Sequence, residues 1–477
     1  MKDSKTDIDW KIIYSRYEGP EARAVDFLYR EMGSHLLRAP GIYTIYTMSC
    51  EKLDTIAGED KNLLVLGCIG ENEILRRFIA EKDVPRDGYA IRVLDNPDCP
   101  GRQLVLIAGS TPLATLYGAI DFIDIAIPEM TAELGNGLRF HNRTLREKLP
   151  QYQRTSAPET KKRSVFSWGH TINNYREYIE NMARLKLNEI MIWNEYPPLN
   201  AKEIVDYAHS WGLAIIWGFS WGWTPACRGT DSKTLAGLGN SIMEQWRNVW
   251  RPLGGDGIYF QSFTETNQEE SNGICIADAA VRLVNETAER IWKEAPGLRL
   301  VFGLHATSVR NKLDIIAKTH PDICILWEDC GGFPYRGDVM PEFDSDNAFT
   351  KRLLEQDREM GLVFKGQMMM EWGCFAHQAG PYVLGNSSKQ TIGNDTSIIE
   401  PGWLHLKSLW MQYGEHAYKL ASMAHSHPNC SILNITGNLT GKIEWPTALC
   451  AQMLWSTREP YQDMLNRIVK MPYININ

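Results

Sequence analysis

The chain has 477 residues, of which 44% are hydrophobic and 23% are charged, and its formal net charge at pH 7 is −8. This length exceeds one ordinary hydrophobic core and predicts two domains or one large barrel with an appended part, while the composition excludes a disordered or fibrous protein. The acidic balance argues against nucleic acid as a partner, because phosphate binding needs clustered Lys and Arg.

The first part of the chain is predicted to be a small α/β domain. Short apolar runs that are typical of strands lie at 41–47, 62–67, 88–94 and 103–109. Helical patterns lie between and after them, near 71–82 and from Thr111 onward. The polar, turn-rich stretch QYQRTSAPETKKRS follows and is interpreted as a linker. We therefore expect an amino-terminal domain over 1–155 and a second domain over 156–477.

The second domain is predicted to be a (β/α)8 TIM barrel with carboxyl-terminal helices. The eight candidate strands cover 164–169, 189–194, 213–219, 257–263, 298–304, 322–328, 362–370 and 430–436. Amphipathic helices are expected near 173–186, 200–211, 235–250, 274–295, 309–318, 345–360 and 401–424, and from Thr447. Near-continuous apolar strands indicate a parallel sheet buried on both faces, and eight strand–helix units favour a closed barrel. An open doubly wound sheet, the alternative, normally has a glycine-rich turn after its first strand, which SWGHTINN lacks.

Polar and aromatic residues gather where the predicted strands end, which is where barrels carry their active sites. In chain order they are Trp168, His170, Trp193, Asn194, Trp221, Glu265, His305, Trp327, Glu328, Asp329, Glu371 and Trp372. A single strand-end Glu is usually a helix cap or an ion-pair partner, and a single Trp usually fills a core. Several strand ends that combine carboxylates with Trp favour a sugar site, because a pyranose packs its apolar face on an indole and its hydroxyls need polar partners.

Cleavage of a glycosidic bond needs two carboxyl groups, one protonated and one ionised. Glu265 stands at the end of a buried strand in GIYFQSFTET, where partial desolvation suits a general acid. Its ionised partner is expected from the sixth or seventh strand, and the candidates are Glu328, Asp329 and Glu371. The other strand-end residues are predicted to bind substrate: Trp168, His170, Trp193, Asn194, Trp221, His305, Trp327 and Trp372.

The sequence predicts neither a cofactor nor a metal. A metal site would use His170, His305, Glu328 and Glu371, but isolated His residues on separate strands are a weak signal and no HExxH motif is present. The ten Cys lack CxxC spacing, which favours reduced thiols over disulfides or zinc. The chain begins without an apolar leader and has no run of about eighteen uncharged residues for a membrane span. We therefore expect a cytoplasmic protein without a membrane partner.

The chain resembles glycoside hydrolases that place an α/β domain before a TIM barrel. The resemblance covers residues 40 to about 440 and is carried by DGYAIRVL…LVLIAGSTPLATLYGAIDFI and GIYFQSFTET. The families are 67 and 115, which are α-glucuronidases, and more distantly family 20, which are β-hexosaminidases. The family-67 pattern implies Glu265 as the general acid and inversion at the anomeric carbon. It also implies bases from later strands, which are Asp329 or Glu328, and Glu371.

Two departures from these families bear on the substrate. Family 20 has an adjacent Asp-Glu pair after the fourth strand, whereas Thr264 precedes Glu265 here, which argues against substrate-assisted chemistry. A uronic acid favours nearby cations, and the strand ends supply only Arg228, Arg336 and Lys365. The sequence thus predicts a glycoside hydrolase whose partner is a carbohydrate. A non-catalytic carbohydrate-binding protein on this scaffold, a β-hexosaminidase-like enzyme and assembly into a homo-oligomer stay open.

Overall fold

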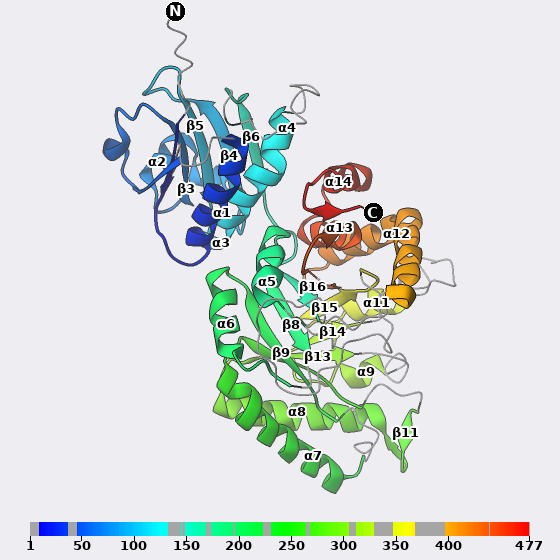
Figure 1. Cartoon of the computed structure of the whole chain (residues 1–477). Helices are drawn as coiled ribbons and strands as arrows, with labels where there is room; N and C mark the ends of the chain where they lie inside the picture. The colour runs from blue at the N-terminus through cyan, green and yellow to red at the C-terminus, as the bar shows by residue number, and fades with distance from the viewer. Residues whose placement is uncertain are drawn as a thin grey trace, which may run out of the picture. The chain divides into compact units, whose positions relative to one another are not determined.

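The structure is a computed structural model of the whole chain, and it divides into two compact units. It describes residues 9–36, 45–131, 145, 148–167, 172, 174–193, 196–222, 230–263, 268–304, 312–328, 347–367, 396–437 and 439–476, with only the backbone of 396–402. One unit comprises Met1–Pro158 with His209–Gly212, and the other comprises Glu159–Ala208 with Leu213–Asn477. In Figure 1 the first unit runs from blue to cyan and the second from green to red.

The amino-terminal unit is a six-stranded mixed sheet with helices. Its strands in spatial order are β2 (Ile45–Ser49), β1 (Trp10–Tyr14), β3 (Asn62–Cys68), β5 (Gln103–Gly109), β4 (Tyr89–Asp95) and β6 (Tyr152–Ser156). The first four are mutually parallel, and β4 runs antiparallel to both of its neighbours. Its helices are α1 (Gly19–Leu36), α2 (Glu73–Phe78), α3 (Pro112–Asp121) and α4 (Ile127–Thr131).

Both faces of this sheet are covered, which explains its continuous apolar strands. Every residue of β3 and β5 is buried, as expected for central parallel strands with helices on either side. One face packs against Ile74 and Leu75 of α2. On the other face α3 comes close to the sheet at Gly118, where a Cβ atom would lie 2.7 Å from Ile107 Cγ2. Only glycine permits that approach without a shift of the helix.

The second unit is a closed barrel of eight parallel strands. Around the barrel they are β10 (Gly257–Gln261), β13 (Arg299–Leu304), β14 (Ile323–Trp327), β15 (Met360–Phe364), β16 (Cys430–Thr436), β7 (Lys162–Phe166), β8 (Glu189–Trp193) and β9 (Ala214–Ser220). Its helices are α5 (Tyr175–Arg184), α6 (Ala201–Ser210), α7 (Ser232–Gln245), α8 (Ile276–Glu294), α9 (Leu313–Ile316), α11 (Ala348–Leu354), α12 (Thr396–His425), α13 (Trp445–Trp455) and α14 (Tyr461–Ile468). Two short ribbons complete it, β11 (Glu270–Ser271) with β12 (Ile274–Cys275), and β17 (Ile443–Glu444) with β18 (Ile474–Asn475).

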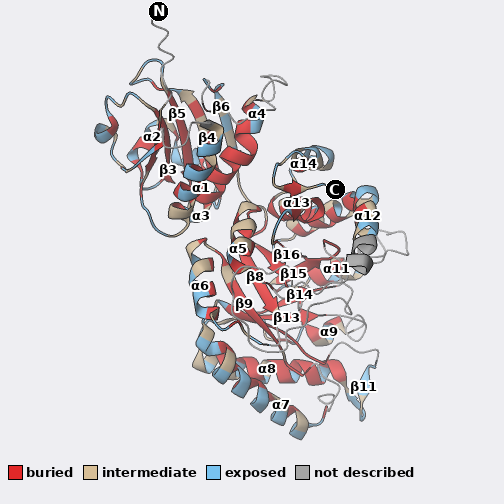
Figure 2. Ribbon diagram, viewed as in Figure 1, coloured by how far each residue is buried: buried red, intermediate tan, exposed pale blue. Residues whose placement is uncertain are grey.

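The barrel interior is a packed core. One buried cluster joins side chains from all eight strands: Phe166, Met191, Ile216, Tyr259, Val301, Cys324, Leu326, Val363 and Ile432. Figure 2 shows these strands buried, whereas the surrounding helices expose their outer sides. Helix α7 buries Leu235, Ile242 and Met243 along one stripe, which is the pattern of a helix that covers a sheet.

The structure confirms the predicted fold class, a TIM barrel preceded by a smaller α/β domain. Strand β16 has the predicted bounds, and the other barrel strands differ by a few residues. The largest difference is β15, expected at 362–370, which begins at Met360 and ends at Phe364. Gly366 with φ of 95° takes the backbone out of the extended region at that point.

Three elements of the amino-terminal unit were not predicted. Strand β1 and helix α1 precede the first predicted strand, and β6 lies within the stretch that was interpreted as a linker. The polar side chains of β6 fit an edge position, where one side of the strand has no neighbour in the sheet. No helix in the described part of the chain is long and apolar enough to cross a membrane.

Candidate active site

The carboxyl end of the barrel brings a small set of polar and aromatic side chains to its inner face. Side chains alternate along a strand, so residues two positions beyond the barrel core point inward as well. From the core cluster this rule selects Trp193, Gln261, Glu328, Lys365 and Asn434. They come from five different strands or directly follow them, and this is the end at which TIM barrels place their chemistry.

Glu328 is the centre of a buried hydrogen-bonded triangle. It follows β14 directly, its amide donates to Leu304 O at 3.1 Å, and its side chain is fully buried. The Tyr259 hydroxyl donates to Glu328 Oε1, and Gln261 Nε2 donates to the same oxygen at 2.5 Å. Gln261 Nε2 also donates to the Tyr259 hydroxyl oxygen at 2.9 Å. Strand β10 is thereby tied to β14 across the intervening strand β13.

These donors explain how a carboxylate can be buried here. Taking a charged group out of water costs several kcal/mol unless hydrogen bonds replace its hydration. A hydrogen bond to a charged group contributes about 1.5–3 kcal/mol. Oε1 of Glu328 accepts two of them, whereas Oε2 is buried and has no hydrogen-bond partner among the described residues. Oε1 therefore accepts as many hydrogen bonds as it has lone pairs, whereas both lone pairs of Oε2 stay available.

The triangle depends on a glycine in the strand between its members. A Cβ atom at Gly303 of β13 would clash with the Tyr259 hydroxyl, lie 2.6 Å from its Cζ and lie 2.8 Å from Glu328 Oε1. The Tyr259 ring is held from the other side by Phe166, with ring centroids 4.9 Å apart, and by Trp193 at 5.7 Å. Gly303 thus leaves the space through which the tyrosine reaches the carboxylate.

A second buried polar side chain lies lower on the same inner face. Asn434 of β16 is fully buried, and its amide nitrogen lies 3.2 Å from Met191 Sδ. Its Oδ1 atom has no hydrogen-bond partner among the described residues. Thr436, two positions on, donates from its hydroxyl to Gln367 Oε1 at 2.9 Å.

The predicted Trp residues do not share one location. Trp193 is half-buried on the inner face, next to Tyr259. Trp221 is fully buried and stacks on Phe260, with centroids 3.6 Å apart. Trp327 points away from the barrel axis, because its indole donates to Thr350 Oγ1 of α11 at 3.2 Å. Trp221 and Trp327 are thus accounted for by core packing, and their placement gives no support to a sugar-binding role.

Most of the other predicted site residues lie outside the described residues. They are Trp168, His170, Asn194, Glu265, His305, Asp329, Glu371 and Trp372. Their roles stay predictions. The structure adds Tyr259, Gln261 and Gly303, which were not singled out, although alternation along GIYFQ from the apolar core would have placed Tyr259 and Gln261 inward.

The opposite, amino-terminal end of the barrel carries buried and half-buried charges, and these are paired. Glu189 is 1% exposed, accepts a hydrogen bond from Ser164 Oγ at 2.6 Å and forms an ion pair with Arg299. Lys162 and Glu359 lie 3.7 Å apart. Charge pairs at this end serve the stability of a barrel, whose chemistry belongs to the other end.

Within the described part of the chain, no three His, Cys, Asp or Glu side chains are placed to hold a metal ion. The sequence has one His-x-His pair, His425 and His427, at the end of α12. Both ring nitrogens of His425 are occupied, since Nε2 lies 2.9 Å from Met453 O and Nδ1 lies 2.8 Å from Thr160 Oγ1. This histidine therefore has no nitrogen left for a metal.

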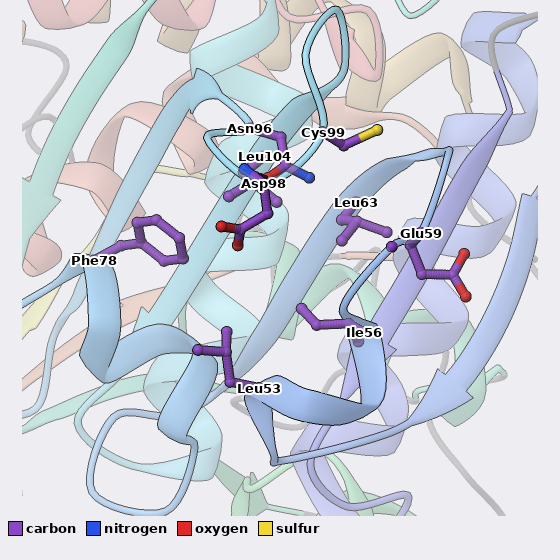
Figure 3. Close-up of a pocket in the computed structure, with 10 residues that line it drawn as sticks. Leu53, Ile56, Glu59, Leu63, Phe78, Asn96, Asp98, Cys99 and Leu104 are labelled. Carbon is purple, nitrogen blue, oxygen red and sulfur yellow. Dashed lines mark hydrogen bonds between the residues drawn. The ribbon is translucent and has the colours of Figure 1, made fainter.

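A hollow in the amino-terminal unit encloses about 270 Å³ when the adjoining open solvent is counted with it. Figure 3 shows apolar side chains such as Leu53, Ile56 and Phe78 around it, with the Asp98 carboxylate among them. Its two carboxylates are already paired, Asp98 with Arg77 and Glu59 with Lys11. The hollow offers a ligand no unpaired carboxylate, and we assign no site to it.

Comparisons with known proteins bear on the scaffold. No protein-family model matches this sequence, and no curated protein matches it. Two solved structures with 10% sequence identity and a TM-score of 0.52 are similar to this chain. CpGH84D, a family 84 glycoside hydrolase, is covered to 70% by an alignment that spans 98% of this chain. A GH138 enzyme targeting pectin rhamnogalacturonan II is covered to 52% by an alignment that spans 95% of this chain.

Such low identity shows the fold alone. The chain thus has the scaffold that these glycoside hydrolases use, and it spans about half the length of the GH138 enzyme. The expected likeness to families 67, 115 and 20 is not confirmed, and the two similar structures named above are enzymes of families 84 and 138.

Proposed function

We propose that this protein is a glycoside hydrolase that cleaves the O-glycosidic bond of an oligosaccharide or glycoside at the carboxyl end of its barrel. The observation that carries the proposal is Glu328, a fully buried carboxylate that follows a barrel strand and is held by two donors from β10. Hydrolysis of a glycoside needs two carboxyl groups that face one substrate. Glu328 is one of three candidates for the ionised group, and its orientation is fixed by its neighbours.

The second carboxyl group is proposed to be Glu265, the general acid. It follows Gln261 by four residues in the sequence, and Gln261 is bonded directly to Glu328. Strand β10 therefore supplies the donors that hold Glu328, and Glu265 follows the same strand in the sequence. Asp329 and Glu371 remain candidates for the ionised member of the pair, since they follow β14 and β15.

The substrate is proposed to be a carbohydrate on three grounds. Trp193 is half-buried beside Tyr259 at the inner face, which is an arrangement that suits the apolar face of a sugar. Two proteins with a similar fold are glycoside hydrolases. Lys365 is buried on the same inner face, and it is the reason to include glycuronides among the substrates tested.

A panel of 4-nitrophenyl α- and β-glycosides and glycuronides tests this proposal. We expect the wild-type protein to release 4-nitrophenol from at least one of them, and Glu265→Gln to lower kcat on that substrate by about a hundred- to ten-thousandfold. The variant should bind this substrate about as tightly as the wild-type protein does, because the substitution keeps the shape of the side chain. Sugar binding by the wild-type protein without any turnover would contradict the proposal and indicate a non-catalytic carbohydrate-binding protein.

A further inference from the structure

We infer that Glu328 is the base that activates water in this hydrolysis, and that Tyr259 and Gln261 are positioning residues that reserve one of its oxygens for that step. The inference rests on the proposed function and adds to it which of the three candidate carboxylates reacts, and through which atom.

The hydrogen bonds of the triangle determine where Glu328 can take up a proton. Tyr259 has one hydroxyl hydrogen, and it goes to Oε1 of Glu328. Gln261 Nε2 lies 2.5 Å from Oε1 and 2.9 Å from the Tyr259 oxygen, and it donates to both. Two donors, the tyrosine hydroxyl and the amide nitrogen, therefore meet at Oε1. A proton on Oε1 would point at two donors, so proton uptake is confined to Oε2.

The orientation of the Gln261 amide follows from the acceptor that it faces. If its oxygen faced Glu328, two acceptors would meet without a hydrogen between them. The nitrogen must therefore face the carboxylate, as the structure has it. This amide then discriminates between the two oxygens of Glu328, and the tyrosine strengthens that discrimination because it donates to the same oxygen.

Oε2 has the properties expected of a reacting atom. It is buried, and it has no hydrogen-bond partner among the described residues. A carboxylate oxygen that the protein itself does not satisfy is costly, by about 1–3 kcal/mol or more, and such atoms call for a functional explanation. Its unused capacity fits a water molecule, which donates one hydrogen to Oε2 and is thereby oriented for attack.

In the proposed step, water attacks the anomeric carbon while Glu328 accepts a proton. Oε2 takes one proton from water while the water oxygen bonds to the anomeric carbon. The bond between that carbon and the leaving oxygen breaks, and the leaving oxygen receives a proton from the general acid, Glu265 in our proposal. One water is consumed, and the products are a sugar hemiacetal and an alcohol. Throughout the step Oε1 stays bonded to Tyr259 and Gln261, so the carboxylate does not rotate.

A purely structural triangle is the competing explanation, and the chain contains a matched control for it. In the amino-terminal unit the hydroxyl of Tyr89 donates to the carboxylate of Asp121, and both side chains are buried. Tyr89→Phe removes the same kind of hydrogen bond as Tyr259→Phe, but in the other unit. Any loss of kcat that exceeds the loss seen in Tyr89→Phe must come from the barrel site.

The test measures kcat and KM between pH 4 and 9, on the 4-nitrophenyl glycoside that the wild-type protein cleaves fastest, and urea unfolding of each variant. We expect Glu328→Gln to lower kcat by about a hundred- to ten-thousandfold. Tyr259→Phe should lower it by about ten- to a hundredfold, with a small change in KM. Tyr89→Phe should keep the wild-type kcat and KM.

The outcomes separate this inference from the proposed function. If Glu328→Gln and Tyr259→Phe lose stability only, as Tyr89→Phe does, the triangle is structural and the inference is wrong, while turnover by the wild-type protein still supports a hydrolase. If the wild-type protein cleaves no member of the panel, both fail. If Glu328→Gln does not fold, Glu328→Asp is tested in its place. That variant keeps the carboxylate but moves it back by the length of one methylene group. We expect at least a tenfold loss of kcat there, and wild-type kcat would overturn the inference.

Discussion

Gly303 offers a sharp test of how the barrel holds Glu328, because a single methyl group should displace the tyrosine that positions it. In Gly303→Ala the new Cβ would lie 2.6 Å from Tyr259 Cζ and 2.8 Å from Glu328 Oε1. Carbon atoms in ordinary contact are about 3.5–4.0 Å apart. The tyrosine or the strand must therefore move by about 1 Å, and Phe166 and Trp193 already pack against the other side of the ring.

Two costs follow from that displacement. Overpacking a filled core destabilises by about 1–3 kcal/mol, so the free energy of unfolding should fall by that amount. Loss of the hydrogen bond from the hydroxyl to Glu328 should lower kcat by about ten- to a hundredfold, as in Tyr259→Phe. Urea unfolding followed by circular dichroism measures the first effect, and hydrolysis of an aryl glycoside measures the second.

Gly237→Ala is the matched control. Gly237 lies inside helix α7, and a Cβ atom there meets nothing within 4 Å. Alanine in a helix interior is favoured over glycine by about 0.5–1 kcal/mol, so this variant should be as stable as the wild-type protein or more so, with unchanged kcat. If Gly303→Ala behaved like Gly237→Ala in both assays, the steric argument for the Tyr259–Glu328 arrangement would be refuted.

Two further predictions concern stability. Glu189→Gln removes the buried partner of Arg299, whose side chain is 17% exposed, and it should lower the unfolding free energy by at most about 3–5 kcal/mol. Glu286→Gln at an exposed helical pair should change it by less than about 1 kcal/mol, and equal effects in urea unfolding would contradict the pairing argument. Burial lowers the pKa of His425 below its usual value, so the unfolded state binds more protons there and stability should fall as the pH drops below about 6.5. In His425→Gln this fall between pH 7.5 and 5 should be shallower, and an unchanged slope would show that His425 is not responsible.

The barrel could be predicted from the sequence because its strands are apolar on both faces and each is followed by a helical pattern. The ends of strands are harder to predict where apolar residues continue past the strand in the sequence. The run LVFKGQMMM suggested a strand to residue 370, but Gly366 ends the extended backbone earlier. Strand β6 was missed for the opposite reason, since an edge strand needs few apolar residues and QYQRTS has almost none.

The candidate site was only partly predictable. Glu328 could be found because it directly follows an apolar run, and that is where barrels place chemistry. Tyr259 and Gln261 could not be linked to it, since they are 69 and 67 residues away in the sequence and meet it only when the barrel closes. The orientation of Trp327 could also not be read from its position at a strand end. It ends the same strand, but alternation turns it outward, toward Thr350 of α11.

The most direct test of the central claim compares two leaving groups in two variants. Glu265→Gln and Glu328→Gln are each assayed on a 2,4-dinitrophenyl glycoside, whose leaving group needs no proton, and on the unactivated glycoside of the same sugar. A general acid and a base predict different patterns: the defect of Glu265→Gln should shrink from about a hundred- to ten-thousandfold to nearly none on the activated substrate, while the defect of Glu328→Gln should be equal on both. Wild-type turnover of the unactivated glycoside by either variant would contradict the assignment of a carboxyl pair to the mouth of this barrel.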